Sequence, residues 1–200
     1  AICVFSYLNK VNSAGALHSM PFSRRMLYFT NYISGLTVCV IPLLINWVLL
    51  AFTSSDYEAA SGAFLAKWFC ESLLIVFYVF SIAVLACIVS GNSVIAVLTG
   101  FAFNVLAMFI ILCLGGYADQ FLYGYTGGLS RIWIKTSPWL SVLSGDGISS
   151  LAAVIYIAVA AAITIAAYFL YKARKLERCG DSYVFGLMRT GIGFLFVFLV

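Results

Sequence analysis

Apolar residues follow one another in blocks long enough to cross a lipid bilayer. A bilayer core about 30 Å thick requires about 20 residues of helix at about 1.5 Å rise per residue. Four complete blocks meet that length: residues 31–53, 63–89, 94–114 and 151–171. Because apolar and polar positions do not alternate within these blocks, the pattern predicts membrane-spanning helices and not the strands of a barrel.

Both ends of the chain continue this pattern. Residues 1–8 are expected to be the end of a preceding span, and residues 188–200 the start of a further one. The predicted fold class is therefore all-α, a polytopic transmembrane helical bundle. The chain is expected to be a fragment that touches about six spans and forms a single transmembrane domain over residues 1–200.

Composition agrees with this prediction. Hydrophobic residues make up 64% of the chain and charged residues 9%, against about 25% charged residues in ordinary soluble domains. A soluble fold of this size cannot bury so much apolar surface, which excludes a water-soluble monomer, a disordered chain and a nucleic-acid-binding domain.

Residues that would carry catalysis are scarce. The chain has one histidine, His18, and six cysteines without a C-x-x-C pair, so no metal site is predicted. It contains no phosphate-cradling G-x-x-x-x-G-K-[ST] loop. We therefore expect no enzyme activity and no cofactor in this chain.

Basic residues predict the orientation in the membrane. Residues 9–30 carry Lys10, Arg24 and Arg25 without an acidic residue, a net charge of +3. Residues 172–189 carry five basic and two acidic residues, also a net charge of +3. Because four complete spans lie between these segments, both must face the same side, which the positive-inside rule makes the cytoplasm.

The long outer segment, residues 115–150, is rich in aromatic residues and glycine, which suits the headgroup region. Gly115 and Gly116 are expected to interrupt the helical pattern. Ser137 and Pro138 predict the start of a short helix, with serine capping and proline at the first position. This helix is expected to be interfacial or re-entrant; a structured loop with no transport role is the alternative.

Glu71 is an ionisable residue inside the second complete span. Such residues are candidates for a translocation path or a gate. Lys67 precedes it by four residues on the same helix face, so a structural ion pair is the other interpretation.

The cytoplasmic segment 9–30 has a pattern of its own. A short helix is predicted to end at Pro21, with Leu17 and Met20 on one face. Ser23 can cap the next helix, which continues into the first complete span. A short apolar face surrounded by positive charge suits docking in a groove of a soluble partner; the alternative is a solvated loop that only satisfies the positive-inside rule.

Two cytoplasmic motifs resemble those of a known family. Residues 17–25, LHSMPFSRR, resemble the "LHSLP-hydrophobe-x-R" motif of bacterial ABC-2 type transporter permeases, most closely an exporter-permease group of Gram-positive bacteria. Residues 171–182, YKARKLERCGDS, resemble the "YxxRKxERAGD" segment of the same group. Met20 replaces leucine and Cys179 replaces alanine, and both changes keep the character of the position.

The resemblance implies a multi-pass permease subunit of an ATP-binding cassette exporter in the bacterial plasma membrane. Such permeases form homo- or heterodimers, and ATP and Mg bind to a separate ATPase subunit. The cytoplasmic coupling segment would be residues 9–30, with its coupling helix at about residues 13–20, and residues 172–187 would form a second cytoplasmic loop. The docking residues implied by the motif are Leu17, His18, Ser19, Met20, Pro21, Arg24 and Arg25.

Two other functions stay open. One is a transporter driven by an ion gradient, which would need ionisable groups near the bilayer middle; Glu71 alone, near one face, gives this alternative little support. The other is a non-transporting membrane sensor or assembly subunit. The sequence does not identify a substrate.

Overall fold

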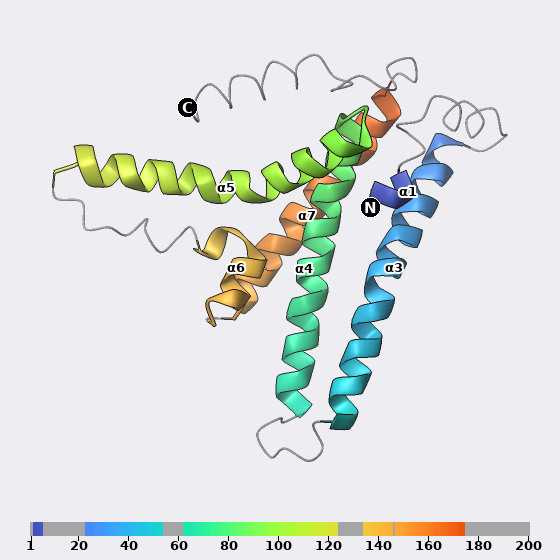
Figure 1. Ribbon diagram of the computed structural model, residues 1–200, viewed down its shortest axis with the longest axis horizontal. Coiled ribbons are helices and arrows are strands. Elements are labelled where there is room, and N and C mark those ends of the chain that lie inside the picture. The colour runs from blue at the N-terminus through green and yellow to red at the C-terminus, as the bar shows by residue number, and fades with distance from the viewer. Residues whose placement is uncertain (1, 6–22, 54–61, 124–133, 146, 175–200) are drawn as a thin grey trace. The chain divides into compact units, whose positions relative to one another are not determined.

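The computed structural model describes residues 2–5, 23–53, 62–123, 134–145 and 147–174. Within these ranges the chain is almost entirely helical and contains no β-strand. The elements, shown in Figure 1, are α1 (Ile2–Phe5), α3 (Arg24–Thr53), α4 (Gly62–Val89), α5 (Ser93–Phe121), the 3-10 helix η4 (Ile134–Thr136), α6 (Pro138–Leu143) and α7 (Ser150–Ala173).

Four of the described helices, α3, α4, α5 and α7, are long and apolar enough to cross a membrane. They contain 30, 28, 29 and 24 residues, which corresponds to about 36 to 45 Å of helix against a bilayer core of about 30 Å. The prediction of four long apolar helices is confirmed, and each predicted block lies within one of them. Large apolar side chains such as Val38, Phe101 and Phe169 are exposed on these helices, as lipid-facing residues would be.

Helix α5 is longer than the sequence pattern predicted. It continues through Gly115 and Gly116 and ends at Phe121. Each glycine costs a helix only about 1 kcal/mol relative to alanine. The stacked rings of Tyr117 and Phe121, 5.9 Å apart, lie in the added turns. The prediction that the two glycines interrupt the helix was wrong.

The starts of α3 and α6 test the two predicted serine caps. Ser23 caps α3 as predicted, because the Met26 amide donates to Ser23 Oγ at 3.3 Å. Helix α6 begins at Pro138 as predicted, but the Ser137 side chain makes no capping hydrogen bond. Ser137 Oγ is instead buried without a hydrogen-bond partner among the described residues. The position of the α6 start was right and the capping bond was wrong.

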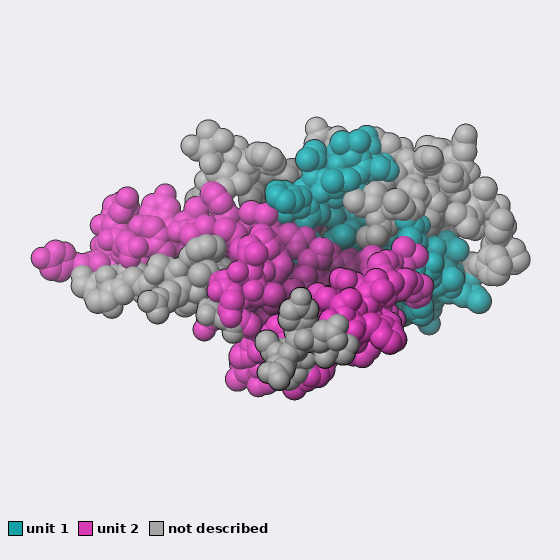
Figure 2. Space-filling model, turned by 60° about the horizontal axis from the view of Figure 1, so that its bottom comes forward, with its two compact units in different colours: residues 1–35, 81–101, 162–200 teal, residues 36–80, 102–161 magenta. Residues whose placement is uncertain are grey.

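The chain divides into two compact units, coloured in Figure 2 and described separately here. Unit 1 comprises residues 1–35, 81–101 and 162–200, and unit 2 comprises residues 36–80 and 102–161. Unit 1 therefore contains the first turns of α3, the last of α4, the first of α5 and the last of α7. Its buried side chains include Phe5, Tyr28, Val84 and Ile88. The buried side chains of unit 2 include Leu74, Tyr78 and Tyr156.

Candidate functional site

Unit 2 contains an open cavity of about 460 Å³. Its described lining comes from α4, η4, α6, and the segment that leads into the first turns of α7. The lining residues are Lys67, Lys135, Ser141, Gly147, Ile148, Ser149, Ala152 and Tyr156.

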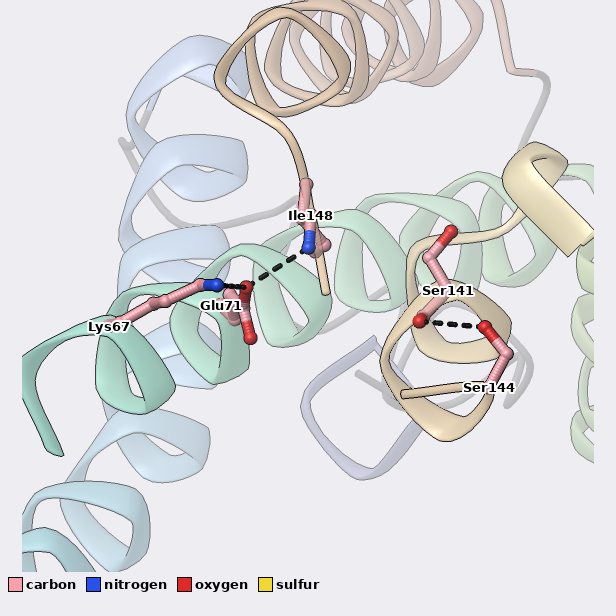
Figure 3. A network of polar contacts seen from close by, with 5 residues as sticks. All are labelled: Lys67, Glu71, Ser141, Ser144 and Ile148. Atoms are coloured by element: carbon pink, nitrogen blue, oxygen red, sulfur yellow. Dashed lines mark hydrogen bonds and ion pairs between the residues drawn. The ribbon is translucent and has the colours of Figure 1, made fainter. Parts of the chain in front are cut away.

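The α4 side of the cavity is built on Lys67 and Glu71 (Figure 3). Lys67 Nζ lies 3.9 Å from Glu71 Oε1, and the amide of Ile148 donates to the same oxygen at 3.0 Å. The Lys67 side chain is 64% exposed and that of Glu71 is 15% exposed. The predicted ion pair is therefore present, and Glu71 also joins α4 to the segment before α7. A role of Glu71 in a path or gate stays a prediction.

Gly147 allows this close approach. Its φ of +65° lies in the left-handed region, which residues other than glycine rarely adopt. A Cβ at this position would lie 3.2 Å from Glu71 Oε1 and 3.3 Å from Lys67 Nζ. Gly145 also has a positive φ, +83°, but a Cβ there would meet nothing within 4 Å. Glycine is thus required at 147 for two independent reasons and at 145 for one.

Tyr156 of α7 also lines the cavity. Its ring packs edge-on against Tyr78 of α4, with centroids 6.0 Å apart. Its hydroxyl donates to the backbone carbonyl of Lys135 and lies 3.4 Å from Ser141 Oγ. Tyr156 therefore fixes the backbone of η4, and with it the position from which the Lys135 side chain extends.

The electrostatic character of the cavity follows from its lining. The described lining residues include two lysines and no acidic side chain. The start of α7 adds the positive end of a helix dipole, and Ser149 Oγ accepts from the Ala152 amide at 3.3 Å there. In the described part of the chain no three side chains of His, Cys, Asp or Glu come together as metal ligands. The arrangement therefore favours noncovalent binding of a negatively charged group.

Unit 1 contains a cluster of hydroxyl groups from three helices. Tyr32 of α3, Ser81 of α4 and Thr164 of α7 have their side-chain oxygens 3.2 to 3.4 Å apart in every pairing. The hydroxyl of Tyr28 also donates to the Thr164 carbonyl at 3.1 Å. Such bonds between membrane helices hold the helices in one arrangement.

Arginines join helix ends in the same unit. Arg24 Nη1, at the start of α3, donates to the carbonyl of Lys172, near the end of α7, at 3.2 Å. Arg174, which is only 3% exposed, donates through Nη1 to the carbonyls of Cys87 and Ile88 at 3.2 and 3.0 Å. These carbonyls belong to the last turn of α4, where an arginine suits both the free acceptors and the helix dipole. The start of α3 and the ends of α7 and α4 are thus connected.

Most of the docking residues implied by the family resemblance, residues 17–21, lie outside the described residues. Arg24 makes the contact with Lys172, and Arg25 is exposed in the first turn of α3. The sequence analysis did not identify Lys135 or Tyr156 as site residues. Gly145 and Gly147, on either side of Asp146 and shortly before a long apolar block, were the signal in the sequence that a turn precedes α7.

Comparison with known proteins gives no match: no family model, no curated protein and no solved structure is similar to this chain. The resemblance to ABC-2 permeases therefore stays a prediction.

Proposed function

We propose that this chain is the membrane-spanning permease subunit of an ATP-binding cassette exporter. A separate ATPase subunit would dock on the predicted coupling helix that ends at Pro21, with Leu17 and Met20 as apolar anchors. The contact between Arg24 and the Lys172 carbonyl carries the proposal, because it brings the two basic segments with the family-like motifs side by side within unit 1.

The charge distribution supports the orientation that docking requires. Unit 1 contains eight of the eleven lysines and arginines and two of the seven acidic residues, a net charge of +6, whereas unit 2 has a net charge of −2. By the positive-inside rule, the helix ends in unit 1 face the cytoplasm. An ATPase subunit would reach the chain from that side.

The contacts in unit 1 also provide a means of coupling. The docking segment leads directly into Ser23, which caps α3. Arg24 holds the start of α3 against the end of α7, and Arg174 holds the end of α7 against the last turn of α4. A displacement of the docking segment would therefore move the ends of three helices together. ATP binding by the partner could then bias the helices between two arrangements.

Co-purification with a P-loop ATPase tests the proposal. The double substitution Leu17→Asp with Met20→Asp should abolish recruitment of the ATPase, because charge would enter an apolar contact. The matched control is Leu122→Asp with Tyr123→Asp, which places the same charges on two exposed apolar residues of unit 2 and should leave recruitment intact. Recruitment that survives the first double substitution contradicts the docking assignment.

Labelling of a cysteine at position 18 tests the orientation separately. In a cysteine-free background, His18→Cys should react with a membrane-impermeant thiol reagent only after the cells are opened. Tyr57→Cys, in the connection between the first and second complete spans that this orientation places outside, should react in intact cells. Reaction of position 18 from outside would refute the orientation. Uptake or export that follows a proton gradient without ATP would favour the ion-gradient alternative.

A further inference from the structure

We propose that the cavity of unit 2 is a binding site for a phosphate-bearing polar group, held between Lys67 and Lys135. This inference rests on the cavity itself and does not depend on the proposed transport function. The ligand would be a phosphorylated headgroup, either on a membrane lipid or on a soluble molecule.

The size of the cavity indicates more than a water-filled gap. Its volume of about 460 Å³ lies within the range of about 300 to 1,000 Å³ typical of small-molecule sites. A water molecule occupies only about 30 Å³ in the liquid. The space therefore accommodates a phosphate together with a small polar group attached to it.

The charges of the described lining select an anion. Lys67 lines the cavity from α4 and Lys135 from η4, so two lysines come from separate elements. The neighbouring carboxylate, Glu71, does not line the cavity, and its Oε1 already accepts the Ile148 amide and pairs with Lys67 (Figure 3). Lys67 is shared with Glu71, but the described lining itself carries positive charge only, and a phosphate would gain charge-assisted hydrogen bonds from its lysines.

Hydroxyl groups complete the lining. Ser141 Oγ and the Tyr156 hydroxyl lie 3.4 Å apart on the cavity surface, and both residues are buried. Hydroxyls of this kind suit the polar part of a headgroup. Tyr156 is a positioning residue for Lys135, because its hydroxyl donates to the Lys135 carbonyl and so fixes the backbone from which that side chain extends.

Depth along the helices fits a headgroup. Lys67 is the sixth residue of α4, about 8 Å along the helix from its first residue. The other lining residues precede α7 or lie within its first two turns. The helices exceed the thickness of the bilayer core by about 12 and 6 Å in total, so their first turns would lie near the boundary between the core and the lipid headgroups.

The test measures binding to the purified full-length protein in a non-ionic detergent. Titration calorimetry with glycerol 3-phosphate, against glycerol as the uncharged control, reports a soluble source. Retention of phosphatidylglycerol against phosphatidylcholine after delipidation reports a lipid source. Binding of either phosphate-bearing probe supports the site only where it depends on Lys135.

Lys135→Gln should weaken that binding at least about tenfold, since one charge-assisted hydrogen bond is lost. The substitution keeps the backbone carbonyl that Tyr156 uses. Lys67→Gln should weaken binding by a similar factor. Lys135→Arg keeps the positive charge and should bind as the native protein does. The control Lys172→Gln, at an exposed lysine of unit 1, should leave the affinity unchanged. Ala152→Leu, which fills the cavity without changing its charge, should also weaken binding.

The proposal is overturned if neither probe binds. It is equally overturned if binding persists unchanged in Lys135→Gln and Ala152→Leu. Should Lys135→Gln fail to fold, Ala152→Leu alone decides, because it leaves both lysines in place.

Discussion

The two left-handed glycines before α7 allow the Glu71 contact to be measured by a matched pair of substitutions. Gly145→Ala and Gly147→Ala both place a side chain at a positive φ. A non-glycine residue in this conformation costs about 1 to 2 kcal/mol. The two variants therefore share the backbone cost and differ in what the new Cβ meets.

The added Cβ at position 147 would approach Glu71 Oε1 to 3.2 Å and Lys67 Nζ to 3.3 Å. Lys67 is 64% exposed, so its ammonium group can move away at little cost, because an exposed ion pair contributes only about 0 to 1 kcal/mol. Glu71 is only 15% exposed, and a shift of a few tenths of an ångström away from the new Cβ would lengthen and weaken the bond that it accepts from the Ile148 amide. A hydrogen bond to a charged group contributes about 1.5 to 3 kcal/mol.

Gly147→Ala should thus be more destabilising than Gly145→Ala by up to about 3 kcal/mol, the value for complete loss of such a bond. A chain of this length loses about 2 to 4 °C in Tm per kcal/mol. We expect the Tm of Gly147→Ala to lie below that of Gly145→Ala by up to about 12 °C. The assay is thermal unfolding of the full-length protein in detergent, followed by the helical circular dichroism signal.

A third substitution assigns the difference to its cause. In a Glu71→Ala background the carboxylate is absent, and Gly147→Ala should then cost no more than Gly145→Ala. Equal Tm values for the two alanine variants in the native background would refute the reasoning, and so would a difference that persists without Glu71.

Three further expectations concern thermal stability, each measured as Tm by the same unfolding assay. Arg174→Met removes two bonds to the last carbonyls of α4 and should lower Tm by at least about 6 °C, since each bond to a charged group contributes about 1.5 to 3 kcal/mol. The substitution Lys172→Met, at an exposed residue, should change Tm by no more than about 1 °C. Equal effects would contradict the role of Arg174. Ser23→Ala should lower the free energy of unfolding by about 1 kcal/mol, as loss of an N-cap does. Ser137→Ala should be neutral or stabilising, because the buried Ser137 hydroxyl has no partner among the described residues. The opposite order would show that the caps are assigned wrongly. Tyr32→Phe should lower Tm by about 1 to 3 °C, because hydrogen bonds between membrane helices contribute about 0.6 kcal/mol on average, and an unchanged Tm would mean that the hydroxyl cluster holds no helix in place.

Local chemistry made several features predictable. Ser23 caps the helix that follows it, because a capping bond needs only a serine and an amide three residues later. The pair of Lys67 and Glu71 follows in the same way from their spacing on one helix. Ser137 shows the limit of such reasoning. Its position and the following Pro138 predicted the helix start, but the side-chain rotamer depends on how α6 packs, and the capping bond does not form.

The cavity in unit 2 was not predictable in this way. Its two lysines lie 68 positions apart in the chain, and neither is unusual for its local sequence. Tyr156 acts through a carbonyl 21 residues earlier, and Arg174 through carbonyls 86 and 87 residues earlier. No periodicity relates such residues, because the hydrogen bonds between them form only after the helices have packed.

The amino-acid sequence by itself determined the class of this protein: four long apolar helices, most of their boundaries apart from the end of α5, and the charge asymmetry between their ends. These properties follow from the transfer of apolar side chains out of water and from hydrogen bonds within single helices, both of which depend on neighbours in the chain. Only the tertiary structure decided which side chains meet, including the two lysines at the cavity, the hydroxyl cluster and the buried Arg174. Such contacts depend on how the helices rotate and approach one another. Because the apolar faces of the helices are alike, a few polar groups and glycines determine that arrangement.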